Sequence, residues 1–185
     1  MDPRFDKLFS IEGKVALVTG GSRGIGEMIA AGFLAHGAKV YISSRKAEAC
    51  EATAKRLAEA SGGACIAFPA DLSHLAGVKS LAARLAEREP ALDILVNNAG
   101  AAWGAPIEEF PEAGWDKVMD TNVKGVFFLT QQLLPQLRRA AAGPSPARVI
   151  NIGSIDGLKA ATFDSWSYGA SKAAVVGLTK AVAAD

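Results

Sequence analysis

The stretch Lys14-Val-Ala-Leu-Val18 and the adjoining Thr19-Gly-Gly-Ser-Arg-Gly-Ile-Gly26 decide the fold of this chain. The first segment is a nearly continuous apolar run, which is typical of a strand buried on both faces of a sheet. A glycine-rich turn follows at once, and residues 27–36 have the pattern of a helix. Strand, glycine-rich turn and helix in this order indicate a nucleotide-binding unit.

Three glycines in this turn, Gly20, Gly24 and Gly26, would let the backbone approach a pyrophosphate. The N–H groups and the dipole of the following helix would then face the anion. The spacing GxxxGxG differs from the GxGxxG of the general dinucleotide fingerprint. An ordinary glycine-rich turn is the alternative, and the two flanking elements favour dinucleotide binding over it.

Apolar runs and amphipathic stretches alternate along the rest of the chain. Strands are expected at 38–43, 64–69, 92–96 and 147–152, and helices at 46–60, 75–88, 115–139 (interrupted near Gly125) and 166–184. This alternation predicts an α/β fold, a Rossmann-type doubly wound parallel sheet with right-handed crossovers and helices on both faces. Nothing divides the chain, so residues 1–185 are expected to form a single dinucleotide-binding catalytic domain.

The end of the second expected strand predicts which nicotinamide cofactor binds. An acidic residue at this point would hold the ribose 2′-hydroxyl of NAD, but the chain has Ser44-Arg45. A guanidinium in place of a carboxylate suits a 2′-phosphate, and Arg23 in the glycine turn could reach the same phosphate. We therefore expect NADP(H). The alternative is that Arg45 only begins the solvated helix that follows.

Two further strand ends carry polar residues. Asp71 could accept a hydrogen bond from an adenine amino group, cap the helix that begins near Ser73, or do both. Asn97-Asn-Ala-Gly100 places amides and small residues where ligands bind in open α/β sheets. A structural reading of Asn97 and Asn98 as turn residues is equally open.

Tyr168 and Lys172 are four positions apart in an expected helix, so they share one helix face. A free phenol titrates near pH ~10, and a cation held close to a phenol favours the phenolate. Ser154 follows an apolar run and could bind the same substrate oxygen. Asn122 lies inside a helix, where its amide could brace the helix or hold a water beside Lys172. Taken alone, the Tyr–Lys pair is better explained as two surface neighbours on a helix, and the motifs upstream favour the catalytic interpretation.

Composition argues against several classes of protein. The 185 residues are 50% hydrophobic and 21% charged, which fits one globular domain. Lys+Arg 20 against Asp+Glu 19 gives no electrostatic reason to expect nucleic acid or an anionic membrane as partner. Cys50 and Cys65 form no CxxC pattern, and His36 and His74 are isolated, so we expect no metal site and a reducing compartment. Neither a signal peptide nor a spanning run is present, so a cytoplasmic protein is expected.

The motifs at 19–26 and 97–100, together with Asn122, Ser154 and Tyr168-x-x-x-Lys172, resemble those of the short-chain dehydrogenase/reductase family in type and order. The resemblance spans nearly the whole chain. It implies a Rossmann-type fold, a nicotinamide cofactor and a catalytic set of Asn122, Ser154, Tyr168 and Lys172. Within the family the chain is most similar to NADPH-dependent 3-oxoacyl-(acyl-carrier-protein) reductases, including the rhamnolipid-associated type. That finer similarity is carried by Trp103, Gln131-Gln-Leu-Leu-Pro135 and Ala147-Arg-Val-Ile-Asn-Ile-Gly-Ser154.

The activity implied is hydride transfer between NADP(H) and a carbonyl or alcohol, with a 3-oxoacyl thioester or a related ketone as substrate. A non-catalytic NADP(H)-binding sensor or scaffold on the same fold is the alternative. The residues expected to contact the cofactor come from the strand ends and the Tyr168 helix. They are Gly20, Ser22, Arg23, Gly24, Ile25, Gly26, Ser44, Arg45, Asp71, Leu72, Asn98, Ala99, Gly100, Tyr168 and Lys172.

The chain departs from the family pattern at its C-terminal end. Family members continue with another strand, a mobile substrate-covering segment and a last strand, whereas this chain stops at Asp185. The C-terminal part of the family fold is therefore expected to be absent. The family also implies a homodimer or homotetramer formed through the helices that contain Asn122 and Tyr168. Trp103, Phe163 and Trp166 flank the proposed site and suggest an apolar pocket, although such residues are as often packing anchors.

Overall fold

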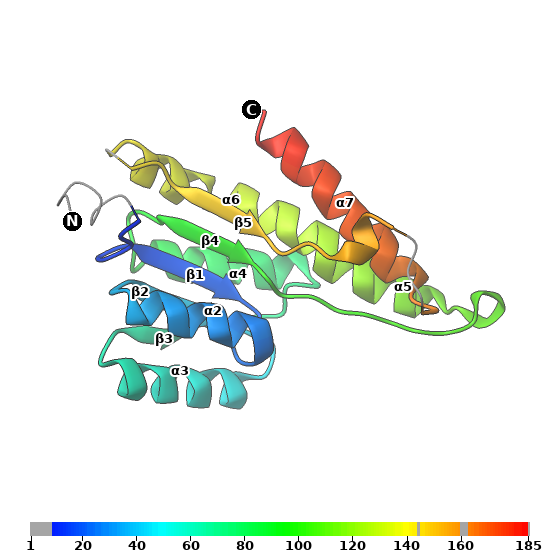
Figure 1. The fold of residues 1–185 in the computed structure, drawn as a ribbon, viewed down its shortest axis with the longest axis horizontal. Coiled ribbons are helices and arrows are strands. Elements are labelled where there is room, and N and C mark those ends of the chain that lie inside the picture. The colour runs from blue at the N-terminus through cyan, green and yellow to red at the C-terminus, as the bar shows by residue number, and fades with distance from the viewer. Residues whose placement is uncertain (1–8, 144, 160–162, 185) are drawn as a thin grey trace.

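Five parallel strands form the central sheet of the computed structural model, which describes residues 9–143, 145–159 and 163–184 (Figure 1). The strands are β1 (Val15–Thr19), β2 (Lys39–Ser43), β3 (Cys65–Ala67), β4 (Ile94–Asn97) and β5 (Arg148–Asn151). Their order across the sheet is β3-β2-β1-β4-β5, and each neighbouring pair is parallel. The order reverses between β1 and β4, and such a reversal creates a ligand crevice beyond the carboxyl ends of the strands.

The apolar run of β1 is buried on both faces of the sheet. Leu17 belongs to a core shared with α4 (Leu75–Ala86) and α6 (Gly125–Ala141). Its neighbours Ala16 and Val18 belong to the opposite core, shared with α2 (Gly24–Ala35) and α3 (Ala47–Ser61). Because successive side chains of a strand point to opposite faces, a doubly covered strand must be apolar throughout. The predicted doubly wound α/β fold is confirmed.

Most predicted boundaries differ from the structure by one to three residues, and one difference bears on the site. The helix expected from residue 27 begins at Gly24, so the glycine-rich turn itself supplies the first turn of α2. The third strand is only Cys65–Ala67, shorter than the predicted 64–69.

The helix predicted over 115–139 is three helical segments joined end to end. They are α5 (Glu112–Met119), a π-helical turn over Asp120–Lys124 (η2), and α6. The expected interruption near Gly125 is this π turn, in which the Gly125 N–H donates to the carbonyl of Asp120. A Cβ at Gly125 would lie 2.6 Å from the carbonyl oxygen of Leu72, so the glycine permits close packing on the chain that follows β3. Single π turns within α-helices are frequent at functional sites.

The last helix, α7 (Trp166–Val182), contributes no residue to either hydrophobic core, although all of its residues are described. Its buried residues are Ser167, Ser171, Lys172 and Val175, of which one is apolar. It packs against α5, η2 and a short 3-10 turn, η3 (Ile155–Gly157). A second 3-10 turn, η1 (Ile107–Glu109), lies in the long connection after β4. Apolar burial alone therefore does little to position α7.

Several remaining sequence features can be located in the fold. His36 and His74 are exposed. Cys50 and Cys65 are free thiols, and burial raises the pKa of Cys65 to about 11. Within residues 9–143, 145–159 and 163–184, no cluster of three His, Cys, Asp or Glu side chains could hold a metal ion. None of the helices in this part of the chain has both the length and the apolar character needed to traverse a bilayer.

Candidate active site

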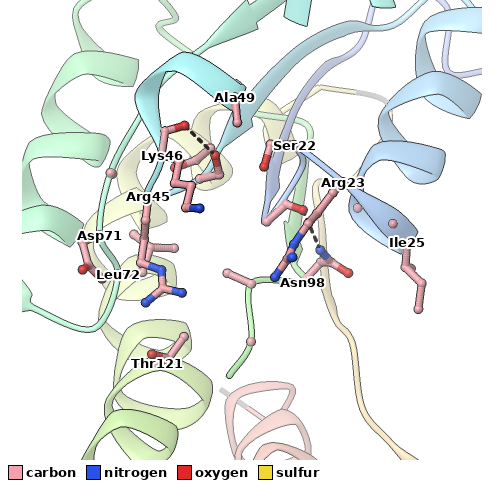
Figure 2. A pocket seen from close by; sticks show the side chains of 18 residues that line it. Ser22, Arg23, Ile25, Arg45, Lys46, Ala49, Asp71, Leu72, Asn98 and Thr121 are labelled. Carbon is pink, nitrogen blue, oxygen red and sulfur yellow. Dashed lines mark hydrogen bonds between the residues drawn. The ribbon is translucent and has the colours of Figure 1, made fainter. Parts of the chain in front are cut away.

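A cavity of about 780 Å³ opens beyond the carboxyl ends of β1, β2 and β4 (Figure 2). Every residue predicted to contact the cofactor lines it, except Tyr168 and Lys172. The sequence did not single out five further lining residues, which are Ser43, Lys46, Ala49, Ala70 and Thr121. None of the predicted catalytic residues lines the cavity itself. Thr121, which precedes Asn122 in the chain, does line it.

The glycine-rich turn has the tight geometry that its glycines permit. Gly20 has a φ of 66°, in the left-handed region that favours glycine. At Gly26 an added Cβ would overlap the side-chain amide of Asn98 and the carbonyl of Gly20. The backbone at the start of α2 is thus left open to the cavity, where its N–H groups and dipole favour a bound anion.

Asn98 holds this turn from the neighbouring strand. Its Nδ2 donates to the carbonyl oxygens of Thr19 (2.9 Å) and Gly20 (3.3 Å). In return, the Thr19 hydroxyl oxygen accepts from the backbone N–H groups of Asn98 and Ala99, both at 3.0 Å. The ends of β1 and β4 are therefore locked together. Asn98 acts as a brace, and Asn97 is the buried last residue of β4, so neither is a turn residue.

Two guanidinium groups reach the opening of the cavity from opposite sides (Figure 2). They belong to Arg23 and Arg45, both exposed residues of the lining. Ser43, the last residue of β2, also belongs to the lining. It is only 1% exposed, and its hydroxyl oxygen is buried without a hydrogen-bond partner among the described residues. A buried hydroxyl without a partner costs free energy.

Asp71 binds the segment that leads into α4. Its Oδ1 accepts from the Ser73 N–H (3.0 Å) and the Ser73 hydroxyl (2.7 Å). The N-cap position of α4 is His74, so Asp71 stabilises the preceding turn and does not cap the helix itself. Burial alone would raise the pKa of the Asp71 carboxyl, but the hydrogen bonds from Ser73 and the charge of Arg45 hold it below its usual value. The carboxylate stays ionised at the rim of the cavity.

These residues fit a dinucleotide that carries an additional phosphate. The glycine turn leaves room for a pyrophosphate, and no carboxylate stands at the end of β2. Two cationic side chains and a buried hydroxyl without a partner are present there instead. Guanidinium groups match phosphate geometry with paired N–H donors.

Lys172 is buried and Tyr168 is half-buried, and the two lie side by side on α7. The Lys172 Nζ lies 5.6 Å from the centroid of the Tyr168 ring and donates a 2.7 Å hydrogen bond to the carbonyl oxygen of Ile152. The lysine is 7% exposed, and this burial lowers the pKa of its ammonium group. A buried, directed ammonium does not fit the alternative of two surface neighbours.

Asn122 uses its whole side chain to join two segments of the site. Its Oδ1 accepts from the Ala101 N–H (2.8 Å), and its Nδ2 donates to the Ala101 carbonyl (2.9 Å) and to the Ser171 hydroxyl (2.9 Å). The Ser171 hydroxyl in turn donates to the backbone carbonyl of Tyr168 (2.7 Å). Of the two roles that the sequence left open for Asn122, the contacts correspond to bracing.

Ser154 begins the η3 turn, and its Oγ accepts from the Asp156 N–H (3.2 Å). The turn packs against α7 backbone to backbone, because a Cβ at Gly157 would lie 2.6 Å from the carbonyl carbon of Lys172. A Cβ at Gly169 would lie 3.3 Å from the carbonyl oxygen of Asp156. The segment that carries Ser154 therefore lies against the turn of α7 that carries Tyr168 and Lys172.

The three aromatic residues near the site have different surroundings. The Trp103 ring packs on Gly114, with the Lys117 Nζ 5.0 Å from the ring centroid. The Trp166 indole N–H donates to the Ala105 carbonyl (3.1 Å). Phe163, by contrast, is 79% exposed. Trp103 is thus a packing anchor, Trp166 is held by its hydrogen bond but stays 44% exposed, and Phe163 is the most exposed of the three.

The residues that the sequence missed had weak signals. Ser43 is the last residue of β2, and its position next to Ser44-Arg45 was the available clue. Ser171 lies one turn from Tyr168, but its contact with Asn122 joins residues 49 positions apart.

Comparison with known proteins agrees with this geometry. A family model described as "short chain dehydrogenase" matches residues 14–185. The rhamnolipids biosynthesis 3-oxoacyl-[acyl-carrier-protein] reductase of Pseudomonas aeruginosa is 55% identical over 177 residues, which cover 96% of this chain and 68% of the relative. Oxidoreductase UcpA of Salmonella typhimurium is 37% identical over 178 residues, covering 95% of this chain and 64% of that protein.

Solved structures give the same picture. The RhlG/NADP active-site complex of Pseudomonas aeruginosa superposes with a TM-score of 0.90 at 56% identity, covering 94% of this chain and 67% of that one. L-Sorbose reductase from Gluconobacter frateurii, complexed with NADPH and L-sorbose, gives 0.88 at 28% identity, covering 95% and 65%. The chain spans about two thirds of the length of these relatives. Fold, motif order and these matches together place the chain in the short-chain dehydrogenase family.

Proposed function

We propose that this chain binds NADP(H) and catalyses hydride transfer between the cofactor and a carbonyl or alcohol carbon. The observation that carries the proposal is the buried Lys172 ammonium, which lies beside the Tyr168 ring and is held in place by the Ile152 carbonyl. NADP(H) supplies the hydride when bound. The protein supplies binding, orientation and a proton.

Cofactor binding is assigned to the cavity lining. The backbone of Gly20, Gly24 and Gly26 lies against the pyrophosphate, at the N-terminus of α2. Arg23 and Arg45 would bind the 2′-phosphate, in keeping with their positions in the lining (Figure 2). The remaining predicted contacts form the walls for the adenine and the riboses; they are Ser22, Ile25, Ser44, Asp71, Leu72, Asn98, Ala99 and Gly100. The NADP and NADPH complexes of the structural relatives support this choice of cofactor.

Proton transfer is assigned to α7 and η3. In the reduction, the Tyr168 Oη gives its proton to the substrate oxygen, and it takes a proton from the alcohol in the reverse direction. Ser154 donates a hydrogen bond to the same oxygen. The Lys172 ammonium stabilises the phenolate and binds the nicotinamide ribose, and Asn122 keeps α7 in register with the loop after β4. General acid catalysis of this kind typically contributes about 10²–10⁴-fold.

The substrate class is a 3-oxoacyl thioester or a related ketone. The 55% identical relative, a 3-oxoacyl-[acyl-carrier-protein] reductase, supports this class. The apolar side chains around η3 support it as well, because Ile155 is 59% exposed and Leu158 is 72% exposed. Ile155 follows Ser154 directly in the chain, so these side chains offer an apolar surface near Ser154 against which an acyl chain would bind.

NADPH absorbance, followed with a panel of 3-oxoacyl thioesters and simple ketones, tests the proposal. Wild-type protein should oxidise NADPH with at least one of them. Tyr168→Phe should bind NADPH with unchanged affinity and lose about 10²–10⁴-fold in kcat. A Tyr168→Phe protein that reduces every substrate at the wild-type rate would refute the assignment. A protein that binds NADPH but turns over nothing would favour the alternative, a sensor or scaffold.

The predicted assembly is a homodimer or homotetramer formed through α5, α6 and α7. A hollow of about 420 Å³ on these helices supports it. Its lining consists of four apolar residues, Met119, Val123, Phe127 and Leu178, and the paired Asp120 and Lys124. Phe127 is 40% exposed, an arrangement typical of an interface residue seen without its partner. Sedimentation velocity of the wild type and of Phe127→Asp would test this, with a shift of the variant to monomer expected. The predicted cytoplasmic location is tested by cell fractionation.

A further inference from the structure

Four polar side chains form a continuous hydrogen-bonded line across one end of the sheet. Thr130 of α6, Asn97 of β4, Asn151 of β5 and Thr179 of α7 constitute it, and we call it the polar line. The Asn97 Nδ2 donates to the Thr130 Oγ1 (3.2 Å) and to the Asn151 Oδ1 (2.8 Å). The Asn151 Nδ2 donates to the Thr179 Oγ1 (2.9 Å), and this last bond lies at the solvent-exposed end of the line. Asn97 and Asn151 are directly paired positions of the neighbouring strands.

The direction of the polar line is fixed by the two threonines. Each hydroxyl donates its own proton to a carbonyl one helical turn earlier, Thr130 to Val126 (2.8 Å) and Thr179 to Val175 (2.7 Å). Both threonines therefore present only lone pairs to the asparagines. Each amide can then satisfy its neighbours in one orientation only. Asn97 Nδ2 faces Thr130 and the Asn151 Oδ1, and Asn151 Nδ2 faces Thr179. Such a line has no equivalent alternative arrangement, so it defines one position for α7.

The polar line reaches α7 close to the Lys172 contact. Asn151 holds Thr179, and the next residue, Ile152, accepts from the Lys172 Nζ. Residues 172 and 179 are seven apart, two turns of helix, so they lie on the same face about 10 Å apart along the axis. Two contacts at this separation oppose a tilt of the helix about either one, in addition to its links through Ser171 and Trp166.

α7 depends on such anchors because apolar packing contributes little to it. Val175 is its one buried apolar residue, and neither core includes it. The other links of α7 are polar as well, namely Asn122 with Ser171 and the Trp166 indole with Ala105. A small tilt about Lys172 would displace Tyr168, and misplacement of a reacting group by about 1 Å can reduce a rate about 10²-fold.

We propose that Asn151 and Thr179 are positioning residues for the reaction, which set the placement of Tyr168 and Lys172 by holding α7 against the end of β5. The inference rests on the proposed hydride transfer. Neither residue lines the cofactor cavity or contacts the reacting groups. Their removal should therefore act on kcat through α7 and leave the binding of NADPH by the glycine turn nearly intact.

Thr179→Val removes the lone pairs and keeps the shape, and Thr179→Ser restores the hydroxyl. In the full chain, kcat of Thr179→Val with a 3-oxoacyl thioester should fall about tenfold or more, with the dissociation constant of NADPH within about twofold of wild type. Thr179→Ser should recover most of the rate. Lys180→Ala, an exposed change on the same helix turn, is the control and should match wild type.

Asn151→Asp is the second variant, which keeps an oxygen for Asn97 and removes the N–H that binds Thr179. It should lower kcat similarly, and the double variant with Thr179→Val should be little worse than either single variant, because both remove the same contact. If Thr179→Val fails to fold, the kcat of Asn151→Asp tests the inference in its place. Wild-type rates in the folded variants, or a Thr179→Ser protein as slow as Thr179→Val, would overturn the inference.

Hydrogen exchange separates this inference from the proposed function. Thr179→Val should speed exchange of the α7 amides and leave those of β1 and β4 unchanged, and Thr179→Ser should not. This measurement needs no turnover. A wild-type protein inactive on every substrate would refute the proposed function, whereas unchanged α7 exchange in Thr179→Val would refute the anchoring of α7.

Discussion

The Lys172 ammonium donates to the carbonyl of Ile152, so the charged end of this side chain has a fixed position beside the Tyr168 ring. Lys172→Met should keep the fold and lose about 10²-fold or more in kcat, since it removes the charge that stabilises the phenolate. Lys180→Met, on the same helix but exposed, is the matched control and should retain the wild-type rate. Steady-state assays with saturating NADPH measure both, and equal rates would show that Lys172 has no part in the chemistry.

The same substitution should change how stability depends on pH. Burial lowers the pKa of Lys172 in the folded state below its ordinary value of 10.5. Between these two pKa values the unfolded chain binds more protons than the folded one, so this group makes stability rise with pH. The difference in unfolding free energy between wild type and Lys172→Met should therefore move in favour of the wild type as pH approaches 10.5. Urea titrations over that range measure it, and a flat difference would contradict the shifted pKa.

Arg45→Asp should convert the cofactor preference. It replaces a phosphate-binding cation by a carboxylate at the position where NAD-binding proteins hold the ribose 2′-hydroxyl. Loss of a charge-assisted hydrogen bond, about 1.5–3 kcal/mol, predicts NADP(H) binding weaker by about 10-fold to 100-fold. NAD(H) binding should improve. Fluorescence titrations with both cofactors test this, with Arg56→Asp as a control for net charge alone, since Arg56 is paired with Glu27. An unchanged ratio of the two affinities would mean that Arg45 is not the selector.

Gly26→Ala should damage the site, whereas Gly32→Ala in the same helix should not. A Cβ at Gly26 overlaps the Asn98 amide and the Gly20 carbonyl, whereas nothing lies within 4 Å of a Cβ at Gly32. Overpacking of this kind costs about 1–3 kcal/mol, so Gly26→Ala should melt earlier and bind NADPH about tenfold or more weakly. Gly32→Ala should be stabilised by up to about 1 kcal/mol. Thermal melts and NADPH titrations measure these effects. Equal melting temperatures and equal NADPH affinities of the two variants would argue against the tight packing at Gly26.

Tyr41→Phe should make the protein less sensitive to alkaline pH. The Tyr41 hydroxyl donates to the Glu89 carboxylate, which also binds Lys39. Burial, followed by the hydrogen bond to Glu89, raises the pKa of Tyr41 above its ordinary value of 10.0. A raised pKa means that this stabilisation is complete below about pH 10 and is lost as pH rises through the folded-state value. Urea unfolding from neutral to alkaline pH should show this loss of stability in the wild type and a smaller loss in Tyr41→Phe. Tyr168→Phe is the control and should lose as much stability as the wild type. One cooperative transition is expected for the predicted single domain.

The parts of the site that depend on local sequence could be predicted. Gly20, Gly24 and Gly26 follow an apolar run and open a helix, and no distant residue is needed to recognise that arrangement. The absence of a carboxylate after β2 is equally local, as Ser44-Arg45 shows.

The parts that depend on partners far along the chain could not be predicted. The brace from Asn98 to Gly20 spans 78 residues, and the link from Asn122 to Ser171 spans 49. Both follow from strand order and helix packing, which the pattern of apolar residues fixes only in outline. The roles of Asn97 and Asn98 stayed open for this reason, because an amide after a strand looks the same in a turn as in a brace.

The π turn at Asp120–Lys124 changes the direction in which side chains point before and after it along the joined helices α5 and α6. One added residue rotates whatever follows by about 100° relative to a regular helix, since each residue turns a helix by that amount. Asn122 can thus point at Ala101 and Ser171 while Leu129 and Leu133, farther along, point into the core beneath the sheet. Deleting Val123 would remove the offset, so that either the amide or the leucine stripe would face the wrong way. If the leucines are misdirected, the variant should be less stable, and if Asn122 is misdirected, it should be less active. Wild-type stability together with wild-type activity is not expected.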